Sequence, residues 1–208
     1  MFSAASKGGP DNRYYPDATL AAGGSGSSTA NLTTYTFSSL AINTANSNRV
    51  VVAVVQTQAT VSSVTIGGIS ATVIGVTACY LAYAVVPTGT TATVVVTHTG
   101  STSRCYVDLF TIVPGKSTTP SDTATDGVVN SINVVKGGVA VFLSTNVTNN
   151  TAFTTTWSGS DTKTSSGGAN GSGNFYWRLD YFTTPFASSY VGTLTSSLSA
   201  KKVMAAWR

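Results

Sequence analysis

The sequence predicts an all-β protein, specifically an antiparallel, jelly-roll-like β-sandwich with an extended N-terminal arm. Three observations predict this class. Short segments alternate apolar residues with Ser and Thr, which is the period of a half-buried strand. Clusters of Gly, Asn, Pro and Ser separate these segments, as turns do. The third observation is compositional: all seven acidic residues are Asp, and no window carries a sustained helical period of apolar residues.

The chain of 208 residues is long enough for one β-domain with a full core. Residues 1–30 hold KGGPDNRYYPD and the Gly/Ser-rich stretch AAGGSGSSTAN, which carry too little apolar surface to fold alone. We therefore expect an N-terminal arm or linker over 1–30 and a single β-sandwich domain over 31–208.

Strand patterns recur through the expected domain. The segments from 32 onward are 32–40, 49–58, 60–66, 70–76, 78–86, 91–98, 103–113, 126–135, 138–146, 151–158, 174–183, 188–195 and 201–207. Residues 49–56 are apolar on both sides, as in a strand that lies between two layers. Gly67 and Gly68 interrupt VSSVTIGGISATVIGV and predict a tight two-residue hairpin turn, so this stretch is framework.

Two strands repeat the same alternation, with one apolar face and one mixed face. The mixed faces join Arg with aromatic residues, a combination enriched at protein interfaces. The alternatives left open are a subunit interface and an internal contact between sheets. These candidate interface residues are Arg104, Tyr106, Asp108, Phe110, Tyr176, Arg178, Asp180 and Phe182.

The N-terminal arm holds a second candidate interface, formed by Arg13, Tyr14 and Tyr15. A polar arm with an aromatic pair can fold onto a neighbouring subunit as it binds. The alternative is a frayed terminus.

The sequence contains little that could support catalysis, so we expect no enzyme, no cofactor and no metal site. His98 is the single histidine, and no nucleophile elbow accompanies it, which favours a buried or turn-capping role. Asp108 and Asp180 alternate with Arg on their own strands, which favours ion pairs over a glycosidase acid. Cys79 and Cys105 lie inside apolar strand patterns and are expected to be buried thiols.

Charge and hydropathy exclude further classes of partner. Lys and Arg are scattered, the formal net charge is +4, and charged residues make up 9% of the chain, so nucleic-acid binding is not expected. The longest aliphatic run is far shorter than a membrane-spanning helix, which predicts no membrane insertion. The first twenty residues lack the apolar centre of a secretory signal.

The succession NRVVVAVV, VSSVTIGGISATVIG and LAYAVVPTGTTATVVVTHTGSTSRCYVDLFTI resembles small β-sandwich structural proteins of tailed bacteriophages. The likeness covers roughly residues 33–113 and consists of strand and turn patterns. Such proteins are head decoration proteins, head fibres or tail appendages. The resemblance implies a jelly-roll-like sandwich without enzyme activity, and it transfers no functional residue.

The leading functional hypothesis is therefore a non-enzymatic virion structural protein, displayed on the surface of the phage particle and assembled in the host cytoplasm. It would attach through its N-terminal arm or through one face of the sandwich. Its expected partners are other virion proteins, either major capsid or tail proteins, and further copies of itself in a homo-oligomer. The alternative hypothesis is a carbohydrate-binding adhesin module that contacts a glycan of the host envelope. Trp157 and Tyr190 are its candidate contacts, because aromatic rings stack on sugars.

Overall fold

The computed structural model describes residues 15–125, 129–146, 151–169, 176–198 and 201–208. Over these ranges the chain forms strands and no helix, and every pair of neighbouring strands is antiparallel. The prediction of an all-β antiparallel sandwich is confirmed, while jelly-roll connectivity stays a prediction. Among the described residues, no helix is long and apolar enough to span a bilayer.

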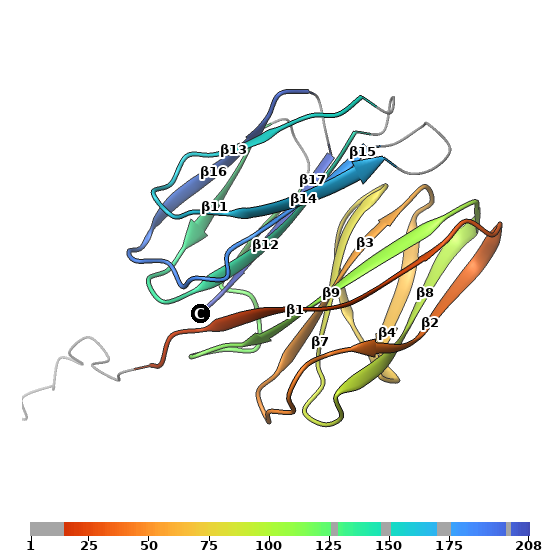
Figure 1. The fold of residues 1–208 in the computed structure, drawn as a ribbon, viewed down its shortest axis with the longest axis horizontal. Coiled ribbons are helices and arrows are strands. Elements are labelled where there is room, and N and C mark those ends of the chain that lie inside the picture. Colours follow the sequence, from red (N-terminus) through yellow and green to blue (C-terminus); the bar gives the residue numbers. More distant parts are fainter. Residues whose placement is uncertain (1–14, 126–128, 147–150, 170–175, 199–200) are drawn as a thin grey trace, which may run out of the picture.

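The N-terminal half of the chain forms two sheets (Figure 1, red to green). The inner N-sheet contains, in spatial order, β1 (Thr19–Ser28), β9 (Cys105–Val113), β3 (Val50–Thr57), β7 (Cys79–Val85) and β6 (Thr72–Val76). The outer N-sheet contains β2 (Leu32–Ala41), β8 (Thr91–Thr102), β4 (Val61–Ile66) and β5 (Ile69–Ser70).

The C-terminal half repeats this arrangement with two further sheets (Figure 1, cyan to blue). The inner C-sheet contains β10 (Asp122–Thr125), β17 (Lys201–Trp207), β12 (Val139–Asn146), β15 (Tyr176–Tyr181) and β14 (Thr164–Ala169). The outer C-sheet contains β11 (Val129–Val134), β16 (Tyr190–Ser196) and β13 (Thr155–Trp157).

Three apolar cores hold the four sheets together as a stack. One core lies inside the N-terminal pair of sheets and one inside the C-terminal pair. The third joins the two inner sheets, and it includes Val52 of β3, Leu81 of β7 and Val141 of β12. Strands β3 and β12 are consequently buried along their whole length, which confirms the expectation for residues 49–56. Where the sequence predicted one sandwich, the structure stacks two.

The predicted arm over 1–30 needs a correction, because Thr19–Ser28 form strand β1 and pair with β9 along the edge of the inner N-sheet. Glycine permits this strand to run close against β2. A Cβ atom on Gly24 would lie 2.6 Å from the backbone nitrogen of Ala41, and one on Gly26 would lie 2.6 Å from the ring of Phe37. Residues 1–14 lie outside the described ranges, and the division of the chain into domains stays a prediction.

The hairpin and thiol predictions are confirmed. Gly67 and Gly68 adopt φ angles of 60° and 79°, the positive values that a two-residue turn between β4 and β5 requires. Cys79 and Cys105 are buried thiols that form no disulfide. Trp207 is fully buried in the closing strand β17, which pairs with both β10 and β12.

Arg49 closes one end of the N-terminal sandwich. Its side chain is fully buried and donates to four backbone carbonyls: Val86 at 2.7 Å, Ile42 at 3.1 Å, Asn43 at 3.0 Å and Thr88 at 2.6 Å. Burial lowers the pKa of this guanidinium. The carbonyls replace the water that a guanidinium normally binds, so Arg49 ties the start of β3 to the loops on either side.

Candidate functional site

Two rows of side chains face each other where the inner sheets meet. Residues directly opposite in an antiparallel ladder point to the same face of a sheet. One row crosses the inner N-sheet and contains Ser27, Tyr106, Gln56 and Cys79. The other crosses the inner C-sheet and contains Gly168, Trp177, Thr145 and Lys201. The thiol of Cys79 donates to the carbonyl of Leu143 at 3.1 Å, so the sheets touch at this point.

A cleft of about 320 Å³ opens beside these rows, between β1 and β9 on one side and β15 on the other. We call it the interlayer cleft. Small residues of β1 leave the space, and β9 and β15 provide its larger side chains. Its lining residues are Ser25, Gly26, Ser27, Tyr106, Val107, Asp108 and Trp177.

Asp108 gives the interlayer cleft its electrostatic character. Burial raises the pKa of its carboxyl group above the ordinary value. Within the described ranges no ion pair compensates the charge of Asp108. The predicted ion pairing therefore fails at Asp108, and an ionised carboxylate here gains from hydrogen-bond donors that enter the cleft.

Two buried polar side chains in the facing rows have no hydrogen-bond partner in the described part of the chain. Both amide atoms of Gln56 lack a partner, and its side chain is 3% exposed. The hydroxyl of Thr145 also lacks a hydrogen-bond partner among the described residues, and Thr145 is fully buried. Gln56 neighbours Tyr106 on the same face, and Thr145 neighbours Trp177. Unsatisfied polar atoms therefore stand directly behind the aromatic residues of the cleft.

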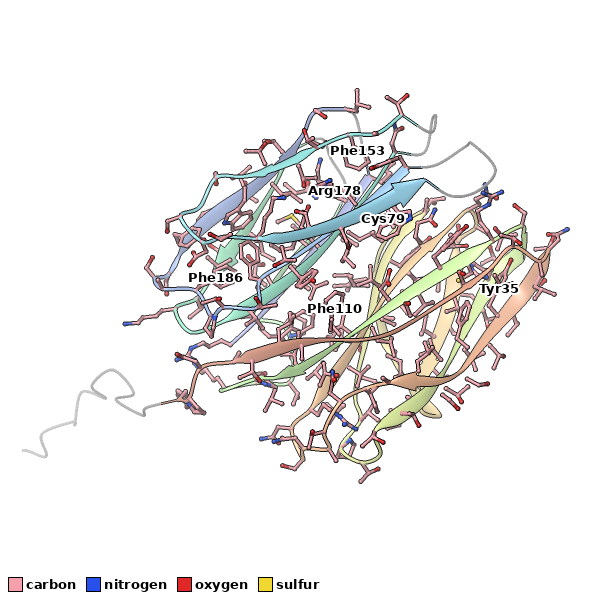
Figure 2. All side chains as sticks on the ribbon, in the orientation of Figure 1. Tyr35, Cys79, Phe110, Phe153, Arg178 and Phe186 are labelled. Atoms are coloured by element: carbon pink, nitrogen blue, oxygen red, sulfur yellow. The ribbon has the colours of Figure 1, made fainter. Side chains whose placement is uncertain are left out.

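The mixed faces of the two predicted strands do not point outward, which corrects that part of the prediction. Phe110 packs in the core between the inner sheets, and Phe182 packs in the C-terminal core. Figure 2 places Phe110 between the two halves of the molecule. Arg104 is buried, and its carbonyl accepts a hydrogen bond from Thr57 at 3.2 Å. These residues make internal sheet contacts, one of the two alternatives, and a subunit interface formed by them stays a prediction.

Asp180 is fully buried in a polar network inside the C-terminal sandwich. Lys163 Nζ lies 2.8 Å from its Oδ1, and Thr155 donates to its Oδ2 at 2.7 Å. Ser165 also donates to Oδ1. Nε of Arg178 lies 3.9 Å from Oδ1, so Lys163 rather than the alternating Arg178 is the main ion-pair partner. With these partners, Asp180 is compensated and has a structural role.

Besides Tyr106 and Asp108, two members of the mixed faces are half-buried, and both have defined neighbours. Arg178 donates through Nε to Thr155 at 3.1 Å, and Tyr176 contacts the ring of Phe153 with centroids 5.6 Å apart. In the predicted arm interface, Tyr15 lies under the ammonium of Lys116, 5.4 Å from its ring centroid. Arg13 and Tyr14 lie outside the described residues.

Trp157 and Tyr190, the predicted glycan contacts, are tied to each other inside the C-terminal core. Trp157 is 9% exposed and packs between Phe142 and Phe182. Its indole donates to the hydroxyl of Tyr190 at 3.1 Å, and that hydroxyl donates to Asp161. Burial and the bond to Asp161 raise the pKa of Tyr190 to about 12. Trp157 presents no open ring face, so a glycan contact there is not supported.

His98 is buried and bonded to neutral groups. Its Nε2 lies 2.9 Å from the hydroxyl of Thr57 and its Nδ1 lies 3.3 Å from the carbonyl of Thr33. Burial lowers the pKa of the imidazole. Within the described ranges no group of three or more His, Cys or Asp side chains is placed to hold a metal ion.

Of the residues that line the cleft, Tyr106 and Asp108 were among the predicted interface residues, and the others were missed from sequence. Ser25 and Ser27 fall in the predicted arm, and Trp177 was assigned to an apolar core face. Gln56 carries the one available signal, since it is a polar residue that ends an otherwise apolar strand flanked by layers.

Compared with known proteins, the chain matches no protein-family model, and no curated protein or solved structure is significantly similar to it. A function for this chain is therefore inferred from its own residues.

Proposed function

We propose that this chain is a non-enzymatic structural protein displayed on the surface of a phage particle, as a capsid decoration, head fibre or tail appendage. The observation that carries the proposal is the stack of four sheets. Both inner sheets are covered on both faces, and three apolar cores run through the molecule. Such burial suits a durable surface component, because apolar area removed from water stabilises a fold in proportion to its extent.

Two further observations support this function. The chain carries few charges, and Ser and Thr occupy many exposed strand positions, such as those of β2 and β4. The resemblance over roughly residues 33–113 points to the same class of protein. The absence of enzyme activity is part of the proposal, and it is supported by the neutral partners of His98 and by the structural role of Asp180.

Attachment to the particle is assigned to the N-terminal segment that precedes β1. Tyr15 is the first described residue, and Arg208 donates to its carbonyl at 3.3 Å. The described part of this segment therefore lies beside Arg208. Arg208 also donates to Pro16 at 2.7 Å. The expected partners are capsid or tail proteins and further copies of this chain.

The test measures incorporation of the full-length protein into phage particles. Particles assembled with Tyr14→Ala/Tyr15→Ala are purified, separated into capsid and tail fractions, and probed for the protein. We expect the variant to fold and to be lost from the particles. A matched control is Val191→Ala, because Val191 is 61% exposed on β16 and belongs to the outer C-sheet. Incorporation of the double variant at the level of the control would contradict the assignment of the segment, and absence of the unaltered protein from both fractions would contradict the function.

A second candidate function, a carbohydrate-binding adhesin module, is favoured by the interlayer cleft. The cleft combines two aromatic residues, Tyr106 and Trp177, with one carboxyl group and two hydroxyl groups. Binding and display are compatible functions on one particle.

A further inference from the structure

We propose that the interlayer cleft is a binding site for a neutral saccharide, with Trp177 and Tyr106 against the sugar ring and Asp108 and Gln56 bonded to its hydroxyls. The inference rests on the second candidate function and is independent of the role in the particle. It moves the glycan site from Trp157 and the outer C-sheet to the junction of the two inner sheets.

Trp177 is the first observation that carries this inference. Of the three tryptophans, Trp157 and Trp207 are buried, whereas Trp177 is half-buried and lines the cleft. Tyr106 lines the same cleft from the facing sheet and is also half-buried. Trp and Tyr provide large apolar faces at a low cost in conformational entropy, which is how protein sites commonly contact a ring-shaped ligand.

Asp108 supplies the second observation. Its carboxyl group is desolvated and, in the described part of the molecule, has no ion-pair partner. A carboxylate accepts hydrogen bonds through both oxygens, and sugar hydroxyls are donors that could satisfy it. The same charge repels anionic ligands from a partly enclosed site. The ligand class that fits is therefore neutral and rich in hydroxyl groups.

The orphaned atoms of Gln56 and Thr145 supply the third observation. Buried polar atoms without partners are rare in native proteins and cost free energy unless a ligand or water satisfies them. Gln56 offers two donors and an acceptor, and Thr145 offers one donor and an acceptor. Neither residue lines the cleft itself, since Gln56 is the ladder neighbour of Tyr106 and Thr145 that of Trp177. Hydroxyl groups both donate and accept, so the proposal requires a sugar hydroxyl to reach between the two aromatic rings to pair with Gln56.

The size of the cleft limits the ligand. Its volume of about 320 Å³ stands at the lower end of the range for small-molecule sites, which is about 300–1,000 Å³. The cleft is open to solvent along β1, where Ser25 and Ser27 are exposed. A short stretch of one or two sugar units fits, and a longer chain can extend along β1.

The experiment screens the full chain on an array of neutral glycans and measures the dissociation constant for the best hit by calorimetry. We expect Trp177→Ala to weaken binding at least about tenfold. Trp157→Phe is the matched control, because it alters a tryptophan of the neighbouring core and leaves the cleft intact. Binding should also protect Trp177 from acrylamide quenching. No signal on the array would overturn the saccharide proposal, and equal binding by Trp177→Ala and the unaltered protein would overturn the placement in the cleft.

Two variants separate a binding role from a structural one. Gln56→Leu removes a polar group that has no partner among the described residues, and Asp108→Asn removes a desolvated charge. Both should unfold at the same or a higher temperature than the unaltered protein and yet bind the glycan several-fold more weakly. Lower thermal stability together with unchanged binding would overturn their roles. Both variants should still enter particles, which distinguishes failure of this site from failure of the display function.

Discussion

The N-terminal and C-terminal sandwiches share one layer arrangement and enclose different chemistry. The N-terminal core is built from aliphatic and aromatic residues, and one of the buried charged groups of this half, Arg49, bonds to backbone carbonyls at one end. The C-terminal core contains an aromatic cluster in which Phe142, Phe182 and Trp157 contact one another. Beside it lies the network around Asp180.

This difference shows two ways to bury charge in a sheet stack. A guanidinium surrounded by carbonyls depends on the backbone of neighbouring loops, which any local sequence can supply. A carboxylate surrounded by side chains depends on Lys163, Thr155 and Ser165 being those residues. The C-terminal half should therefore be more sensitive to single substitutions in its polar network.

The largest expected effect is the loss of β17. Deletion of residues 203–208 removes the strand between β10 and β12 and takes side chains from two cores, including Val203 and Trp207. We expect the chain to lose cooperative folding, and circular dichroism with thermal scanning would measure this. A truncated protein that stays soluble and unfolds in one sharp transition would contradict the central position of β17.

Arg49→Leu is expected to destabilise the N-terminal sandwich by about 4 kcal/mol. It leaves backbone carbonyls without their Arg49 donors, including those of Val86 and Thr88, and each buried unpaired group costs about 1–3 kcal/mol. Chemical denaturation measures the change. Arg49→Lys keeps the charge and loses the planar set of donors, so it should be intermediate. A loss below about 1 kcal/mol for Arg49→Leu would show that the loops rearrange to pair these carbonyls.

Lys163→Met is expected to lower the free energy of unfolding of the C-terminal sandwich by about 3 kcal/mol. The substitution leaves the fully buried carboxylate of Asp180 without its main ion-pair partner. The side chain of Lys163 is 14% exposed, which places the effect at the low end for a buried pair. Lys136→Met, at an exposed position, is the matched control and should change stability little. Equal unfolding free energies for the two variants would contradict a structural role for the network.

A smaller loss of stability is expected when the pH is lowered and His98, in the N-terminal sandwich, becomes protonated. Burial lowers the pKa of His98 in the folded state, so the unfolded chain binds the proton more readily. The stability associated with neutral His98 is complete above about pH 6.5, the ordinary imidazole value, and falls as pH drops through the folded-state value. His98→Gln should reduce the loss of unfolding free energy over this interval. An identical pH dependence in the variant would assign the loss to other groups.

The strands were predictable from sequence where packing and local pattern agree. Strand β3 has apolar residues on both faces, and the turn at Gly67 and Gly68 needs positive φ angles, so each carries its own signal. Strand β1 was missed because a Gly/Ser run is typical of a linker. Its glycines are explained by the proximity of β2, a contact between segments that only the folded structure brings together.

The candidate site was less predictable for a related reason. A period of two divides a strand into two faces and leaves open what covers each face. Phe110 and Asp108 lie on the same mixed face of β9, yet one is buried against the inner C-sheet and the other lines a cleft. The pairing of Tyr106 with Trp177 across that cleft depends on how two sheets stack. The roles of Arg104 and Asp180 likewise depend on residues distant in sequence.

The two buried thiols have a consequence for the redox chemistry of the protein. Burial raises the pKa of Cys105 to about 12, which keeps it protonated at neutral pH, and the thiol of Cys79 donates a hydrogen bond to the carbonyl of Leu143. The thiolate is the species that forms disulfides and reacts with oxidants, so both cysteines are poor substrates for oxidation. The fold also contains no disulfide between them to be reduced. The protein should therefore keep one covalent structure, and one melting temperature, in reducing and oxidising solutions alike.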